Sequence, residues 1–65
     1  MRQLSLPFDH EVLKEKNGVA LVQINDRNQT RYATYRTNKE GHAYWGNYTN
    51  NQAEAEFDFE KRANL

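Results

Sequence analysis

Few side chains in the sequence are suited to acid–base or metal chemistry. His10 lies between Asp9 and Glu11, and His42 follows Glu40 by two residues. Imidazoles and carboxylates serve as general bases and metal ligands, but neither group shows a recognised ligand spacing. The sequence also lacks cysteine, a glycine-rich phosphate loop and a serine nucleophile motif. We therefore predict no enzyme, no catalytic residue, no metal and no cofactor, and we place both histidines at the surface.

Charged and aromatic residues favour a second kind of chemistry. Residues 27–39 contain four basic side chains and no acidic one, whereas residues 53–60 contain four acidic side chains and no basic one. Aromatic rings that stack on bases, beside arginines that pair with phosphates, are typical of single-strand binders. This pattern predicts, as an alternative function, single-stranded nucleic-acid binding by a basic, aromatic sheet face that contains Arg31, Arg36, Tyr32 and Trp45. A net charge of zero argues against it, since nucleic-acid modules tend to be basic.

The length and composition indicate one small domain over residues 1–65. A chain of this size buries only about 60% of the surface that its unfolded form exposes, so the core is thin. No disulfide supports that core, and the mean hydropathy of −1.13 is polar for a folded protein. The N-terminal residues lack the apolar run of a signal peptide, and no segment is long and apolar enough to span a membrane. We expect a cytoplasmic protein.

Turn signals divide the chain into short strands. Asn17-Gly18, the polar run 25–28 and the run 38–41 alternate with segments rich in β-branched and aromatic residues. The predicted strands cover residues 19–25, 30–37 and 42–49, and the nearly continuous apolar run VALVQI is the best core candidate. Residues 10–16 fit either a first hairpin strand or a short helix capped by Asp9, and we favour the strand. Residues 1–9 are predicted to be an extended arm, with Leu4, Leu6 and Phe8 alternating along an edge.

The stretch AEAEFDFE, residues 53–60, has the alternation of a strand but the composition of a helix. Thr49 with Gln52, or less closely Asn51 with Glu54, could cap a helix, and acidic residues precede basic ones in the order that the helix dipole favours. We therefore predict a helix over residues 50–64. Phe57 and Phe59 then point about 160° apart around it. Either the helix is wedged between two surfaces, or one of these rings is exposed and available to a partner.

The two strands before this helix form a hairpin in the predicted fold. With a loop of even length, facing residue numbers sum to 79, so Ala33 faces Gly46 and leaves a shallow lane in which the helix could lie. An odd loop would change this pairing. The sequence does not decide which of the two sheet faces the helix covers. The predicted fold class is α+β, a small antiparallel β-meander of three to four strands, over residues 10–49, packed by one C-terminal helix.

Residues 32–62 resemble small uncharacterised proteins encoded on phages and mobile elements of Gram-positive bacteria. In that family a strand of the type Y-x-T-[WY]-R leads through a polar turn to an aromatic-W-G-x-Y segment and then to a helix. The matching residues here are Tyr32, Thr34, Tyr35, Arg36, Tyr44, Trp45, Gly46, Tyr48, Phe59, Lys61 and Arg62. The resemblance implies a strand–turn–strand–helix order and a prophage or mobile-element context. It implies no activity and no site residue.

The leading functional hypothesis is a non-catalytic binding or regulatory module that contacts another protein, with a homodimer as one form of that contact. It depends on the two diverging phenylalanines, the aromatic sheet and the thin core. The candidate partner-binding residues are Phe57, Phe59, Tyr32, Trp45, Arg31 and Arg36. Nucleic acid is the less favoured partner, and no membrane contact is expected.

Overall fold

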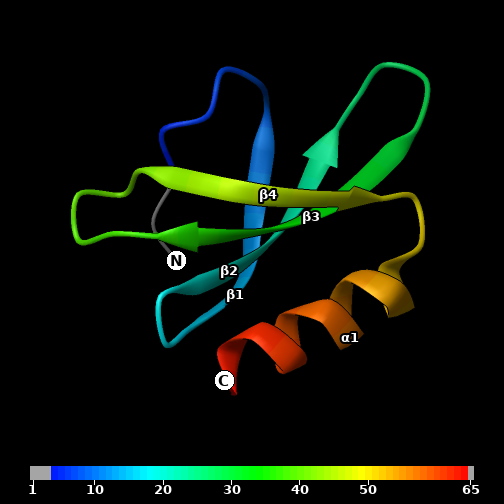
Figure 1. Cartoon of the computed structure of the whole chain (residues 1–65). Helices are drawn as coiled ribbons and strands as arrows, with labels where there is room; N and C mark the ends of the chain where they lie inside the picture. The colour runs from blue at the N-terminus through cyan, green and yellow to red at the C-terminus, as the bar shows by residue number, and fades with distance from the viewer. Residues whose placement is uncertain (1–3, 65) are drawn as a thin grey trace.

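The computed structural model describes residues 4–64 as a four-stranded antiparallel sheet packed by one helix (Figure 1). Neighbours in the chain are neighbours in the sheet, in the order β1-β2-β3-β4. The strands are β1 (His10–Lys16), β2 (Val19–Asn25), β3 (Thr30–Thr37) and β4 (Ala43–Thr49), and the helix is α1 (Gln52–Ala63). This confirms the predicted α+β meander with a C-terminal helix. Residues 10–16, for which two conformations were considered, form a strand.

Glycine and asparagine build the tight turns between the strands. Asn17 and Gly18 both have positive φ, 52° and 75°, which is the geometry that a two-residue hairpin requires. In the β3–β4 loop, Gly41 has a φ of 84°, and Asn38 Oδ1 accepts hydrogen bonds from the backbone N–H groups of Glu40 and His42, both at 3.0 Å. These local interactions stabilise the turns at the strand ends.

The helix begins at the second of the two predicted caps. Asn51 is the N-cap residue, and its side chain accepts from the N–H groups of Ala53 at 2.9 Å and Glu54 at 3.2 Å. The first choice, Thr49, was wrong as a cap: its hydroxyl accepts from Asn51 N–H and donates to the Glu54 carboxylate. Glu54 in the first turn and Lys61 in the last complement the helix dipole, as predicted.

The sheet is covered on both faces, so the molecule has three layers. On one face α1 packs on the helix-side cluster, which comprises Val19, Leu21, Ala55, Phe59 and Ala63. On the other, residues 4–9 fold over the arm-side cluster, which comprises Leu4, Val12, Ala20, Val22, Ile24, Ala33 and Tyr35. Strand β2 contributes alternate residues to both clusters, and residues 19–22 are all at most 1% exposed. The run VALVQI is therefore the centre of the core, as predicted.

Residues 4–9 of the predicted arm contact the sheet differently from the prediction, and residues 1–3 lie outside the described residues. Leu4 is 5% exposed within the arm-side cluster, and Leu6 and Phe8 pack against that cluster. These side chains lie over a face of the sheet instead of pairing along its edge, and residues 4–9 form an irregular segment with bends. The apolar alternation is the same in both arrangements, but covering the face buries more apolar surface in a thin core.

The register between β3 and β4 also differs from the prediction. Ala33 pairs with Tyr48, not Gly46, and Thr37 pairs with Ala43 across a loop of odd length. A bulge opposite Tyr35 places two residues of β4, Trp45 and Gly46, against one residue of β3. No lane for the helix forms there, because Ala33 belongs to the face that the arm covers and α1 packs on the opposite face.

Candidate functional site

The two phenylalanines of the helix have different environments. Phe59 is 2% exposed and packs in the helix-side cluster between Ala55 and Ala63. Phe57 is 73% exposed. A side chain two residues away from the buried stripe must point outward at 3.6 residues per turn. Of the two arrangements considered, one exposed ring is the one that the structure shows.

Tyr32 is held beneath the start of the helix. Its ring is half-buried against the helix-side cluster, and its hydroxyl lies 3.4 Å from Gln52 Oε1. This position joins β3 to the first turn of α1. The ring is therefore part of the packing between helix and sheet, and little of it is left for stacking against a ligand.

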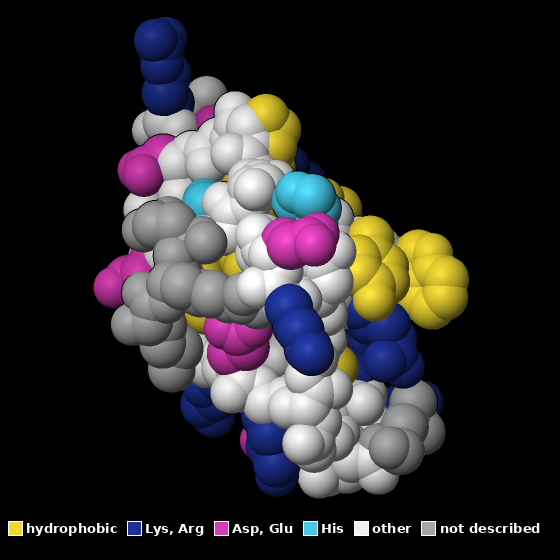
Figure 2. Space-filling view, turned by 90° about the vertical axis from the view of Figure 1, so that its left-hand side faces the viewer, with side chains coloured by type: hydrophobic (Ala, Val, Ile, Leu, Met, Phe, Trp, Pro, Cys, Tyr) yellow, Lys and Arg dark blue, Asp and Glu magenta, His cyan; other side chains and the backbone are white. Residues whose placement is uncertain are grey.

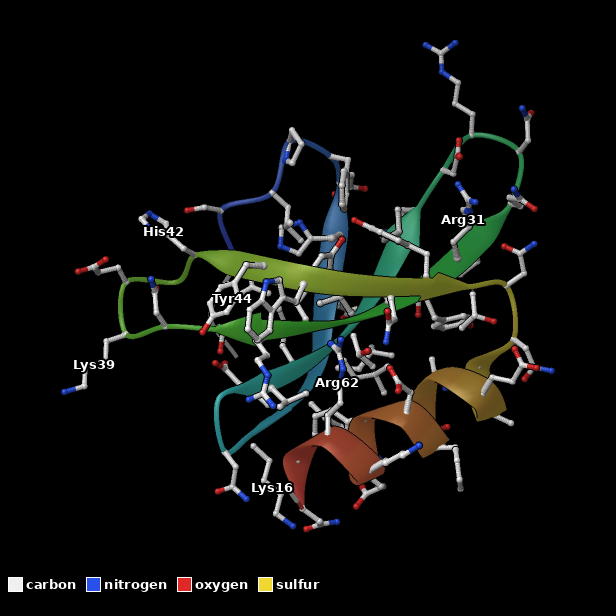
Figure 3. All side chains as sticks on the ribbon, in the orientation of Figure 1. Lys16, Arg31, Lys39, His42, Tyr44 and Arg62 are labelled. Atoms are coloured by element: carbon white, nitrogen blue, oxygen red, sulfur yellow. The ribbon has the colours of Figure 1, made fainter. Side chains whose placement is uncertain are left out.

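Arg31 and Arg36 lie on opposite faces of the sheet. Arg31 pairs with Ile24 of the arm-side cluster, whereas Arg36 pairs with Val19 of the helix-side cluster. An odd separation along a strand places side chains on different faces. Figure 3 shows Arg31 near the start of β3, far from Tyr44. The basic, aromatic face of the alternative hypothesis is thus divided between two surfaces.

The first of these surfaces is an aromatic and cationic cluster at the β4 bulge, made of Arg36, Tyr44 and Trp45, which we call the bulge patch. Trp45 is 72% exposed and Tyr44 is 42% exposed, and their rings pack edge to face with centroids 5.6 Å apart. Arg36 Cζ lies 6.0 Å from the centroid of the Trp45 ring, within the range of a cation–π contact. Figure 2 shows hydrophobic side chains projecting from the body of the molecule beside basic ones.

The backbone at the bulge has an unusual conformation. Trp45 has a φ of 53°, in the left-handed region that bulky residues rarely occupy. Gly46 follows it, and a Cβ atom there would lie 2.5 Å from Cε1 of the Tyr35 ring. A side chain at position 46 would clash with the buried Tyr35 ring, and the neighbouring indole of Trp45 lies in solvent.

A polar network joins the same part of the sheet to the helix. Asp58 accepts hydrogen bonds from Thr34 Oγ1 and from Asn47 Nδ2, and Arg62 donates to the Thr34 carbonyl at 3.3 Å. Burial opposes the charge of Asp58, but these hydrogen bonds and the nearby Arg62 lower its pKa from the ordinary value of 3.8. Figure 3 shows Arg62 reaching from α1 toward the sheet. The sequence shows only the i, i+4 spacing of Asp58 and Arg62, because their partners belong to distant strands.

The second surface is a groove on the arm face that the sequence does not reveal. It has a volume of about 640 Å³ and is lined by Phe8, Ile24, Asn25, Asp26, Arg27, Arg31 and Tyr48. Tyr48 is 56% exposed, and its hydroxyl accepts a hydrogen bond of 2.7 Å from Tyr35. Burial, and then this hydrogen bond, raise the pKa of Tyr35. Phe8 lies some 40 residues from Tyr48 in the chain, so only the folded arm creates the groove.

The two histidines differ in burial and in their hydrogen-bond partners. His10 is 8% exposed, so its predicted surface position was wrong: Nε2 accepts from the Leu4 N–H at 3.2 Å and Nδ1 lies 3.0 Å from the Phe8 carbonyl. The ring links the arm to the start of β1. His42 is exposed, 3.8 Å from the Glu40 carboxylate. Within residues 4–64 no three metal-ligating side chains come together.

Comparison with protein-family models, with curated proteins and with solved structures gave no match. The resemblance to small phage and mobile-element proteins therefore stays a prediction. The one helix of residues 4–64, α1, is too short and too polar to cross a membrane.

Proposed function

We propose that this chain is a small, non-catalytic binding module that contacts another protein through the bulge patch, Arg36, Tyr44 and Trp45. The observation that carries the proposal is Trp45: a bulky aromatic residue, 72% exposed, held in a left-handed backbone conformation. Such a conformation costs about 1 to 3 kcal/mol and persists where the surrounding structure enforces it, often at functional sites. A cytoplasmic location and a phage or mobile-element context belong to the same proposal.

The composition of the bulge patch suits a protein partner. Tryptophan, tyrosine and arginine are the residues that most often dominate binding energy at protein interfaces. In the free chain the Trp45 ring already contacts both Tyr44 and Arg36, so little conformational entropy would be lost on binding. Two of its three residues, Tyr44 and Trp45, lie on the edge strand β4, in which every residue is at least partly exposed.

The patch is also held on a firm support. The network of Asp58 with Thr34 and Asn47 fixes β4 against β3 and α1, and Gly46 seats against the Tyr35 ring. A binding residue on a rigid element keeps its geometry before the partner arrives. By contrast, Phe57 projects from the outer side of α1 and makes no ring contact within residues 4–64, so we rank it below the bulge patch.

A photo-crosslinking experiment tests the proposal. A photoreactive phenylalanine analogue at position 44 is expected to give a discrete crosslink, either to a second copy or to another protein of the cell, identified by mass spectrometry. The same analogue at position 48, on the same strand but on the arm face, is the matched control. Trp45→Ala should abolish the crosslink from position 44. The proposal fails if positions 44 and 48 give the same products, or if Trp45→Ala leaves them unchanged.

Solution mass separates the two kinds of partner. Sedimentation analysis from micromolar to millimolar concentration should show a dimer, weakened by Trp45→Ala, if the partner is a second copy. If the chain is a monomer over that whole range, the crosslinked partner is a different protein and the homodimer hypothesis is rejected.

A further inference from the structure

We infer that the groove on the arm face binds a nucleotide unit: an aromatic base between Phe8 and Tyr48, with its phosphate paired to Arg31 and Arg27. This site is independent of the bulge patch, because it lies on the opposite face of the sheet. Either site can therefore fail its test without affecting the other.

The groove has apolar walls and a charged rim. Phe8 comes from the arm, Tyr48 from β4 and Ile24 from β2, so the apolar residues belong to three separate segments. A volume of about 640 Å³ is within the range of sites for small organic ligands. Aromatic side chains of this kind stack on bases of any sequence, since every base has a π face. The walls therefore suit a planar ring.

The charged side chains of the groove have no side-chain partner among residues 4–64. Asp26, Arg27 and Arg31 form no ion pair or side-chain hydrogen bond with other described residues. Elsewhere, by contrast, Lys14 pairs with Glu56 and Arg62 pairs with Asp58. Among the lining residues two guanidinium groups stand against one carboxylate, with a second carboxylate, Asp9, beside the rim at Asn25, and arginine matches phosphate in a bidentate geometry. These groups are available to an anionic ligand.

The acidic member distinguishes a nucleotide from a simple anion. Asp26 repels the phosphate of either ligand, but in a nucleotide its carboxylate can also accept hydrogen bonds from a base amino group or a ribose hydroxyl. Its neighbour Asn25 is already engaged, with Asp9 at 3.3 Å and Gln23 at 3.2 Å, so this part of the rim is held in place. Aromatic walls, two arginines and one acceptor together fit a base, a phosphate and a donor group in one ligand.

The test is a titration of the full chain followed by its backbone amide NMR signals. The probes are adenosine 5′-monophosphate, adenosine, inorganic phosphate and a short single-stranded oligoadenylate. We expect the monophosphate to shift signals of residues 24–31 and of Tyr48, to bind more tightly than adenosine or phosphate alone, and to weaken with added salt. Tighter binding of the oligoadenylate would identify nucleic acid as the source of the nucleotide, and equal binding would identify the free nucleotide.

Matched variants on one strand locate the site. Arg31→Gln removes a charge-assisted contact and should weaken binding about tenfold or more. Arg36→Gln makes the same change on the opposite face and should leave binding unchanged. Tyr48→Leu should weaken binding, whereas Tyr44→Leu should not, with the amide spectrum of each free variant confirming its fold. The inference is overturned if no probe shifts these signals, if phosphate alone binds as tightly as the nucleotide, or if Arg31→Gln and Arg36→Gln have equal effects.

Discussion

At the scale of the residue, two positions of β4 set the shape of the exposed surface. Gly46 has no room for a side chain beside the Tyr35 ring, and Trp45 takes the left-handed conformation that places its indole in solvent. The order Trp-Gly is notable because the glycine is needed for space, while the residue with positive φ is the tryptophan. The conformational strain therefore falls on the side chain that is most exposed.

Two substitutions of Trp45 should distinguish the strain of its left-handed backbone from the contacts that its side chain makes with a partner. The left-handed conformation costs a non-glycine residue about 1 to 2 kcal/mol, and glycine escapes that strain but gains freedom in the unfolded chain worth about 0.5 to 1 kcal/mol. We expect Trp45→Gly to be more stable than Trp45→Ala by up to about 1 kcal/mol, as measured by urea unfolding. Both variants lose the crosslink from position 44. A less stable Trp45→Gly would show that the backbone there is not strained.

At the scale of the element, the helix is attached to the sheet by one apolar stripe and a polar contact on each side. Ala55, Phe59 and Ala63 form the stripe, Lys14 pairs with Glu56 at 3.1 Å toward β1, and Asp58 bonds to β3 and β4. The alternation of AEAEFDFE, when placed on a helix, sends one phenylalanine into the core and the other out.

Truncation of the two phenylalanines should differ in effect. Phe59→Ala empties the centre of the helix-side cluster and should lower the free energy of unfolding by about 3 to 5 kcal/mol. Phe57→Ala removes an exposed ring and should stay within about 0.5 kcal/mol of the wild type. Urea unfolding followed by circular dichroism measures both. If Phe59→Ala does not fold, Phe59→Leu replaces it, with a smaller expected loss of unfolding free energy. Equal losses for substitutions at Phe57 and Phe59 would contradict this placement of the helix.

The Asp58 network predicts a dependence of stability on pH. The folded pKa of Asp58 lies below its ordinary value of 3.8, so its carboxylate stabilises the fold above that value. This contribution is lost as the pH falls through the folded pKa. Wild type should lose stability from about pH 5 to about pH 2 more steeply than Asp58→Asn. Glu11→Gln is the control, since Glu11 forms no ion pair or side-chain hydrogen bond within the described part of the chain, and its curve should match the wild type.

At the scale of the whole molecule, the arm, the sheet and the helix form three layers around a single strand. Strand β2 faces both clusters, so the loss of either cover exposes one half of the same core. A domain of 65 residues has a stability of about 3 to 10 kcal/mol. Both the arm and the helix are therefore needed for a stable fold, and the arm should unfold together with the sheet and the helix as one cooperative unit.

Leu4→Ala tests this cooperativity. Leu4 is 5% exposed in the arm-side cluster, so its truncation should lower the free energy of unfolding by about 2 kcal/mol or more, in a single transition with an unchanged urea dependence. Leu6→Ala, at a partly buried position of the same arm, should have a smaller effect. An unchanged midpoint for Leu4→Ala would mean that the arm is not part of the folded unit.

The sequence by itself determined the local features of this protein. Turn residues, strand composition and helix caps act over a few residues, so they predicted the meander, the C-terminal helix and the central position of VALVQI. Tertiary structure alone decided the β3–β4 register, the role of the arm and the buried position of His10. At the bulge Gly46 lies against the Tyr35 ring, and the groove is lined by both Phe8 and Tyr48. Such pairings join residues far apart in the chain, and their geometry follows from packing, which no local pattern encodes.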